Sequence, residues 1–311
     1  QQMVCRCVRG SMFAGSLVAI ITPMKADGSL DLESWDRLID LHAQSGTAGI
    51  IVGGTTGESP TVTEEEQLAL LKRAKARLPA KVALIAGMGG SSTLHSAERA
   101  RRLGEAPIDG LLVVTPAYNK PTQEGLYQHY AAVARSATVP IILYNVPGRT
   151  GVDMQPATVA RLAKLPRIVA IKEALGTVER ILELCALLPQ EFSVLTGDDA
   201  TARESVLAGA RGVVSVTANL FPRAMADMIA AALRGDAALD ARLDAPMSGL
   251  HKVLFTEANP IPVKWAATQM GLCQEGIRLP LTWLSEEYHA RVAAALREAS
   301  AAFGLKTAGA A

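Results

Sequence analysis

The chain has 311 residues, and its 31 basic and 30 acidic side chains give a formal net charge of +1. This balance, with an aromatic content of only 4%, argues against nucleic acid or an anionic membrane surface as a partner. No apolar run approaches the ~18 residues that a membrane-spanning helix needs, so we expect no membrane partner.

Cysteine and histidine give no sign of a disulfide framework or a metal centre. The cysteines are too few and too scattered for structural disulfides, which favours a reducing, cytoplasmic location; they are Cys5, Cys7, Cys185 and Cys273. Cys5 and Cys7 have no second Cys/His pair to accompany them, and the five histidines lie far apart in the sequence. We therefore expect no metal site.

In chain order, the first segment does not fit a folded domain. Residues 1–11 lack the apolar core of a signal peptide, and we interpret them as a non-native or disordered extension before Met12. Eight short apolar runs then alternate with helical patterns at intervals of roughly 20–35 residues, as expected for βα units with parallel strands. The runs cover residues 16–21, 49–52, 82–86, 110–115, 139–144, 168–172, 192–196 and 212–216.

Two of the intervening helices have clear signals. Thr63 and Glu66 have the spacing of a capping box, which marks the start of a helix. The other helix is marked by apolar residues at i, i+3, i+4 and i+7, which are Trp35, Leu38, Ile39 and His42.

Eight βα units in roughly 220 residues predict an α/β fold, a (β/α)8 TIM barrel over residues 12–234. A doubly wound dinucleotide-binding sheet would need G-x-G-x-x-G after its first strand, but that strand leads into Thr22-Pro23-Met24. From about Gly235 the strand pattern stops, and helical patterns cover residues 236–257, 261–270 and 285–303. We therefore expect residues 235–311 to form a C-terminal helical appendage.

Lys172 ends the apolar run 168–172. Strict alternation puts it on one face with Ile168 and Ala170, and puts Val169 and Ile171 on the other. A lysine at the end of a buried strand either emerges into solvent or has a chemical role. Partial desolvation favours the neutral amine, the form that attacks a carbonyl carbon to give a Schiff base.

The predicted barrel distinguishes a solvent-exposed lysine from a reactive one, because in this fold reactive side chains lie at the C-terminal ends of the strands. Lys81 begins its strand and so lies at the opposite, structural face of the barrel, and Lys25, Lys120 and Lys264 fall in loops or helices. Lys172 is therefore the candidate nucleophile.

Tyr144 ends the preceding strand and shares a face with Pro140 and Ile142. Neighbouring strands lie roughly 4.8 Å apart, so Tyr144 and Lys172 can share a small site. A phenol beside an amine can pass protons during imine formation. The alternative is that Tyr144 simply caps the barrel.

Three strand-end loops supply further candidates. Residues 53–59 are glycine-rich and carry Thr55 and Thr56, so that backbone N–H groups and hydroxyls can cradle a carboxylate or a phosphate. The loop 115–121 presents Tyr118. The loop 145–151 presents Arg149, which suits bidentate capture of a carboxylate. A tight turn and solvated side chains remain the alternatives.

Together these segments are specific, and from Met12 to near its end the chain resembles the dihydrodipicolinate synthase family of pyruvate-dependent class I aldolases. The segments that carry the resemblance, in the family's order, are Gly54-Thr55-Thr56-Gly57-Glu58-Ser59, Tyr118-Asn119, Tyr144-Asn145-Val146-Pro147-Gly148-Arg149-Thr150, Ile171-Lys172-Glu173-Ala174, Gly197-Asp198-Asp199 and Asn259-Pro260-Ile261-Pro262-Val263-Lys264-Trp265.

The resemblance implies the chemistry. Lys172 is expected to form a Schiff base with pyruvate, whose carboxylate lies at Thr55 and Thr56. The derived enamine attacks the aldehyde of L-aspartate 4-semialdehyde, and Arg149 binds the carboxylate of that substrate. The expected product is 4-hydroxy-tetrahydrodipicolinate, in the first committed step of diaminopimelate and lysine biosynthesis.

The resemblance also assigns supporting parts. Thr55, Tyr144 and Tyr118 match a proton-relay triad in which Tyr118 comes from a neighbouring subunit, and Gly197 and Val214 match residues that line the pocket. No metal or organic cofactor is implied. The implied assembly is a homotetramer of two tight dimers.

One departure concerns regulation. Some bacterial members bind free lysine at a dimer interface through a tyrosine, two histidines, an asparagine and a glutamate. The aligned residues here are Ala117, Glu64, Gln67, Ser91 and His95. We therefore expect weak or absent inhibition by lysine.

The nearest rivals are sister lyases, N-acetylneuraminate lyase and 2-keto-3-deoxy sugar acid aldolases, which share the lysine and the tyrosine. Arg149 and the paired threonines favour the synthase. A catalytically silent barrel would be expected to lack Lys172 or the triad, and all of these residues are present.

Overall fold

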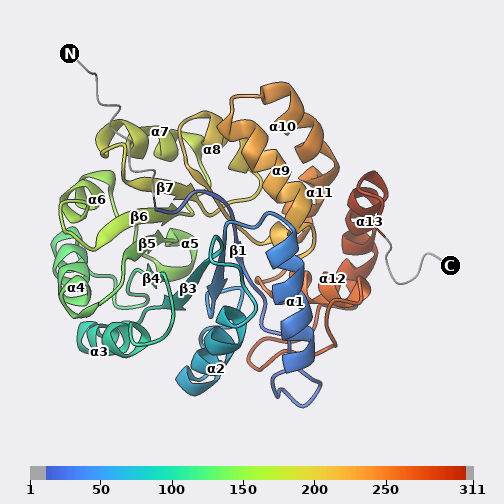
Figure 1. The fold of residues 1–311 in the computed structure, drawn as a ribbon, viewed down its shortest axis with the longest axis horizontal. Coiled ribbons are helices and arrows are strands. Elements are labelled where there is room, and N and C mark those ends of the chain that lie inside the picture. The colour runs from blue at the N-terminus through green and yellow to red at the C-terminus, as the bar shows by residue number, and fades with distance from the viewer. Residues whose placement is uncertain (1–11, 306–311) are drawn as a thin grey trace.

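The computed structural model describes residues 12–305, in which eight parallel strands form a closed barrel with neighbours in sequence order, β8 pairing with β1. Figure 1 shows the strands in the centre of the molecule with helices around them. The predicted (β/α)8 barrel is confirmed. The strands are β1 (Gly15–Ala19), β2 (Gly49–Val52), β3 (Ala83–Met88), β4 (Gly110–Val114), β5 (Ile141–Asn145), β6 (Ile168–Glu173), β7 (Ser193–Thr196) and β8 (Gly212–Ser215).

The longer helices that follow the strands have one apolar face, which packs on the outside of the barrel. The predicted capping box is present at Thr63 and Glu66, and the predicted apolar face of α1 is buried. From β1 to the first α-helix after β8, the helices are α1 (Leu32–Gln44), α2 (Glu64–Lys75), α3 (Thr93–Leu103), α4 (Gln123–Ser136), α5 (Pro147–Thr150), α6 (Pro156–Leu162), α7 (Val178–Leu187), α8 (Ala202–Leu207), η1 (Thr217–Asn219) and α9 (Pro222–Leu233).

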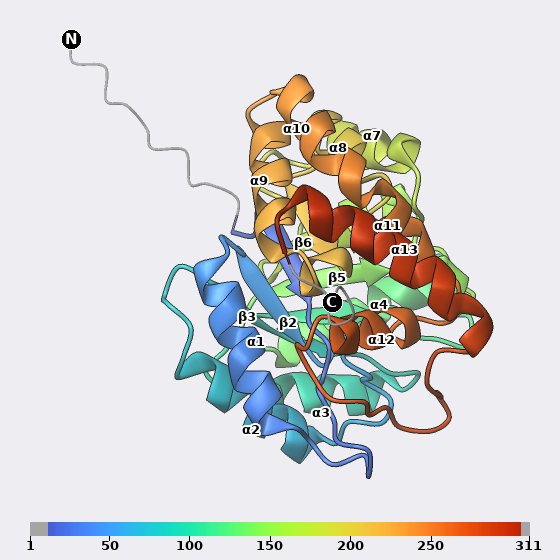
Figure 2. The same ribbon diagram turned by 90° about the vertical axis from the view of Figure 1, so that its right-hand side faces the viewer.

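Further helices follow α9, as expected: α10 (Ala237–Asp244), η2 (Ala245–Met247), α11 (Ser248–Val253), α12 (Ile261–Gln269) and α13 (Glu286–Ala302). The single helix expected over residues 236–257 is wrong. It divides at η2, which contains Pro246, because proline has no N–H for the helical ladder and its ring clashes with the preceding turn. Figure 2 shows α13 beside α11 and α12, and α13 contacts both of them.

Alternation along the strands separates two apolar clusters. One fills the barrel and includes Ile142, Tyr144 and Val214. The other lies between the strands and the surrounding helices and extends into α12 and α13. The C-terminal helices therefore share the outer core of the barrel.

One predicted face is wrong at the start of β6. Ala170 lies inside the barrel as expected, but Ile168 belongs to the outer cluster and Val169 packs against the inner one. Ile141 pairs with Ile168, whereas Ile142 pairs with Ala170. Val169 is thus an extra residue in β6, and such a bulge reverses the side-chain pattern before it.

Within residues 12–305, the structure has no helix that is long and apolar enough to cross a membrane. The expected extension 1–11, with Cys5 and Cys7, lies outside the described residues.

Candidate active site

Lys172 and Tyr144 lie together where the carboxyl ends of β6 and β5 meet. Their Cα atoms are partners across the two strands, and Nζ of Lys172 lies 4.1 Å from the centroid of the Tyr144 ring. Each residue is 6% exposed. An amine held over the face of a phenol ring gains a cation–π contact when it is protonated.

Gly197 follows β7 and makes room for the lysine side chain. A Cβ atom at this position would lie 2.8 Å from Cε of Lys172 and 2.8 Å from Cβ of Ala174, which is closer than such atoms approach in proteins. Val214 lies on β8, is 1% exposed and belongs to the inner cluster with Tyr144. Of the two predicted lining residues, Gly197 therefore lies against Lys172, and Val214 lies inside the barrel.

A polar network lies directly behind the lysine and the tyrosine. Asn145 and Glu173, the next residue in each strand, are Cα partners, and Nδ2 of Asn145 donates to Glu173 Oε1 and Oε2 at 3.1 and 3.0 Å. It also donates to Asp153, which pairs with Arg180 at 2.8 Å. Burial raises the pKa of Glu173, whereas the Arg180 guanidinium lowers the pKa of Asp153.

The threonine loop after β2 lies on one side of a cavity of about 520 Å³. Thr55 is half-buried and lines this cavity with Tyr144. Thr56 is 2% exposed, and its Oγ1 accepts a hydrogen bond of 2.9 Å from Nδ2 of Asn259. The two predicted threonines thus face different surroundings: Thr55 faces the cavity and Thr56 faces the segment before α12.

The loop is held by a buried ion pair. Glu58 has φ of 58°, a left-handed conformation that is uncommon for a residue with a side chain. Its carboxylate lies 2.5 Å from Nζ of Lys264 on α12, and the Lys264 side chain is 0% exposed. The same carboxylate accepts a hydrogen bond of 3.1 Å from the backbone N–H of Arg278. Removing either partner of such a pair leaves a buried charge, which costs about 3–5 kcal/mol.

Arg149 and Tyr118 lie at the outer edge. Arg149 is exposed, and its Nη2 donates to the backbone oxygen of Asn259 at 3.2 Å. Tyr118 has φ of 73° and is 93% exposed, so its side chain projects from the surface. Within one chain, Tyr118 does not line the cavity that Thr55 and Tyr144 share.

Sequence reasoning assigned no role to Asn145, Glu173, Glu58, Asn259 or Lys264. A usable signal existed for the first two, since each follows a predicted site residue in its strand. The other three stood in segments that carried the resemblance, but their mutual contacts depend on the folded chain.

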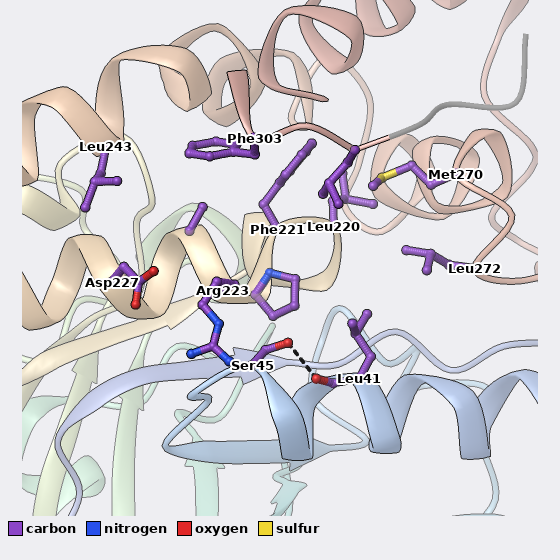
Figure 3. A pocket seen from close by; sticks show the side chains of 13 residues that line it. Leu41, Ser45, Leu220, Phe221, Arg223, Asp227, Leu243, Met270, Leu272 and Phe303 are labelled. Carbon is purple, nitrogen blue, oxygen red and sulfur yellow. Dashed lines mark hydrogen bonds between the residues drawn. The ribbon is translucent and has the colours of Figure 1, made fainter. Parts of the chain in front are cut away.

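A second pocket of about 390 Å³ lies between α1, α9 and the C-terminal helices. Figure 3 shows its apolar wall, with Phe221, Phe303 and Met270, and Arg223 on the side of α1. None of the predicted site residues lines it. Among residues 12–305, no group of three or more His, Cys, Asp or Glu side chains is placed to hold a metal ion.

A buried lysine against a tyrosine at the mouth of a (β/α)8 barrel is typical of aldolases that work through a lysine Schiff base. Residues 12–299 match the dihydrodipicolinate synthetase family, and the chain belongs to this family. The resemblance drawn from its motifs is confirmed. The protein is accordingly an enzyme of the lyase class.

Relatives are similar over nearly their whole length. The chain is 50% identical to the 4-hydroxy-tetrahydrodipicolinate synthase of Ectopseudomonas mendocina, covering 92% of this chain and 98% of that one. It is 49% identical to the Pseudomonas aeruginosa synthase, with the same coverage.

Solved structures agree with the fold. A chloride-inhibited dihydrodipicolinate synthase from Acinetobacter baumannii, complexed with pyruvate, has a TM-score of 0.90 at 46% identity and covers 92% of this chain and 99% of its own. A structure described as the first monomeric dihydrodipicolinate synthase variant has a TM-score of 0.91 at 41% identity, covering 95% and 98%.

Proposed function

We propose that the protein condenses pyruvate with L-aspartate 4-semialdehyde to give 4-hydroxy-tetrahydrodipicolinate, the first committed step of diaminopimelate and lysine biosynthesis. The observation that carries the proposal is the buried Lys172 amine over the Tyr144 ring. Relatives at about half identity bear the name of this synthase.

The reaction begins when Nζ of Lys172 attacks the ketone carbon of pyruvate. The ketone oxygen takes up one proton from the attacking amine and one through Tyr144, and it leaves as water while the C–N double bond forms. Loss of a methyl proton gives the enamine, whose carbon attacks the aldehyde carbon of the second substrate as the aldehyde oxygen takes up a proton. The substrate amine then attacks the imine carbon and displaces Lys172.

Binding is divided between two carboxylate subsites. Thr55 and Thr56 hold the carboxylate of pyruvate through their hydroxyl and backbone donors, and Arg149 holds the carboxylate of the semialdehyde by paired N–H donors. Gly197 and Val214 line the pyruvate pocket. No metal or organic cofactor takes part, because the lysine imine itself withdraws electrons from the reacting carbon.

Tyr118 completes a proton relay with Thr55 and Tyr144 from the neighbouring subunit. Its exposure of 93% and left-handed backbone support a role outside its own chain. Besides the surface around Tyr118, an exposed apolar surface lies on α7 and the adjacent α8, with Leu182, Leu187 and Leu207 at 40–52% exposure. Two such surfaces fit a homotetramer of two tight dimers.

Free lysine inhibits weakly or not at all. The side chain of Gln67 is 1% exposed, donates to two backbone oxygens, and accepts from Arg99 at 2.7 Å. Glu64 pairs with Arg102 at 2.6 Å. These side chains are committed within the subunit and do not offer lysine its ligands.

Two further parts of the proposal concern organisation. Residues 12–234 form the barrel unit, and the helical appendage begins at residue 235; the last residues of the proposed range 235–311, from 306 on, lie outside the described residues. The small number of scattered cysteines favours a reducing cytoplasm.

Borohydride trapping tests the proposed function. The enzyme is reduced with borohydride in the presence of pyruvate, the modified peptide is mapped, and turnover is assayed with aspartate semialdehyde. An adduct on Lys172 with turnover is the expected result. An adduct elsewhere, or none, contradicts the mechanism, and an adduct without semialdehyde turnover points to a sister lyase.

A further inference from the structure

Asn259 touches both proposed carboxylate subsites. Its side-chain Nδ2 donates to Oγ1 of Thr56 at 2.9 Å, and its backbone oxygen accepts from Nη2 of Arg149 at 3.2 Å. Asn259 and Thr56 are 6% and 2% exposed, so water does not compete freely for the bond between them.

The direction of this bond determines what Thr56 can do. A hydroxyl has one O–H donor and two acceptor lone pairs. Because Thr56 accepts from the amide, its own O–H stays free for another acceptor. A carboxylate is acceptor-only, and its hydrogen bonds with neutral donors are charge-assisted.

We propose that Asn259 is a positioning residue that keeps the Thr56 hydroxyl turned as a donor toward the carboxylate of pyruvate. The inference rests on the proposed function and deepens it, since it adds a residue outside the barrel strands that sets affinity for the first substrate. Asn259 acts through Thr56 and does not itself bind pyruvate.

The place of Asn259 is set independently of Thr56. The same two segments are joined a second time by Glu58 and the fully buried Lys264, five residues after Asn259. Within residues 12–305, Oδ1 of Asn259 has no hydrogen-bond partner. Thr56 is thus the side chain that the amide serves, and the amide is not part of a larger structural network.

Two substitutions at Asn259 separate a positioning role from simple packing. Asn259→Asp keeps the shape but replaces the donor by an ionised acceptor, so Thr56 turns its O–H toward the new carboxylate and away from pyruvate. Asn259→Ala removes the amide and leaves Thr56 free to rotate. We expect the KM for pyruvate to rise about tenfold or more in Asn259→Asp and about threefold in Asn259→Ala.

The values of kcat should change by less than about threefold in both variants, because neither touches the Lys172 amine. Lowering the pH should reduce the KM of Asn259→Asp relative to wild type, since a protonated carboxyl can donate again. If packing were the only role, Asn259→Ala would be the more damaging change, and that order overturns the proposal.

If Asn259→Asp does not fold, a double-mutant comparison of Asn259→Ala with Thr56→Val tests the same role. Thr56→Val removes the hydroxyl at similar volume, and in that background Asn259→Ala should leave the KM for pyruvate within about twofold. Independent, multiplying effects contradict the role through Thr56. Trapping separates the two proposals. If wild type forms no pyruvate adduct on Lys172, both fail. A normal adduct, together with independent effects of the two substitutions that multiply in KM, contradicts only the role of Asn259.

Discussion

The amide of Asn145 holds the carboxylate of Glu173 directly behind the pair that the reaction needs. The two residues are Cα partners on β5 and β6, one position beyond Tyr144 and Lys172. Both are buried, at 0% and 1% exposure, so the bond between them fixes the strand ends without help from solvent.

Asn145→Ala should therefore loosen the site and the fold together. The change removes the amide donor that serves both the buried carboxylate of Glu173 and that of Asp153, and we expect the free energy of unfolding to fall by about 2–3 kcal/mol, with slower trapping of pyruvate on Lys172. Urea unfolding and borohydride trapping measure the two effects. Gln155→Ala is the matched control, because Gln155 bonds Asp153 of the same network at the surface and should cost less than about 0.5 kcal/mol.

Gly197→Ala should slow Schiff-base formation in a protein that still folds. The added methyl would meet Cε of Lys172 at 2.8 Å, so the lysine side chain must move away from Tyr144. We expect at least about a tenfold fall in the rate of pyruvate trapping. The control is Gly249→Ala in α11, because its added Cβ would lie 3.9 Å from its nearest neighbour, Cβ of Ala295 on α13. A normal trapping rate in Gly197→Ala contradicts the close packing inferred here.

Tyr118→Phe should reduce turnover and leave adduct formation nearly unchanged. Trapping needs Lys172 and its near neighbours, whereas the complete reaction needs the proton relay. Loss of a positioned proton donor lowers the rate by about a hundredfold or more. Steady-state assay and trapping of the same preparation make the comparison, and full activity in the variant excludes Tyr118 from the relay.

Free lysine at submillimolar concentration should leave the initial rate unchanged. The side chains at the aligned positions are otherwise engaged, as for Gln67 with the backbone oxygens of Val52 and Gly87. Initial rates at several lysine concentrations, with pyruvate near its KM, provide the measurement. Half-inhibition in that range means that lysine binds through other residues.

Stability should fall as the pH drops below about 6.5, in part because of His42. Burial lowers the pKa of His42 from 6.5 to about 3. Between these two pH values the unfolded chain therefore binds a proton at His42 that the folded chain does not bind. The free energy of unfolding then falls by about 1.4 kcal/mol per pH unit. Between pH 6.5 and 5, wild type should lose about 1.6 kcal/mol more than His42→Gln in urea unfolding, because the unfolded histidine is already half protonated at pH 6.5. Equal losses would show that His42 is not buried as a neutral ring.

The barrel and its central pair were accessible to sequence reasoning because their signals are local. Each strand is a short apolar run, and the barrel rule assigns every strand end to the same mouth, which brings Tyr144 and Lys172 together. The face of Ile168 was wrong, since the bulge at Val169 depends on how β6 pairs with β5. No periodicity within a strand encodes that pairing.

Contacts between distant segments were beyond such reasoning. Thr56 and Asn259 are 203 positions apart, and Glu58 and Lys264 are 206 apart. The two residues of each pair share neither a helix face nor neighbouring strands, so no local pattern predicts the contact. The roles of Tyr118 and Arg149 stay predictions, because both side chains are exposed at the edge of a single chain.

The long separation between Glu58 and Lys264 orders events during synthesis. At roughly 5–20 residues per second, a ribosome adds the 206 positions between them in roughly 10–40 s. A growing chain thus contains Lys172 and all eight strands before Asn259 and Lys264, the residues that hold the threonine loop, have been synthesised. Substrate capture becomes available only when the polypeptide is nearly finished, so truncated products retain the nucleophile but not the assembled cradle around it.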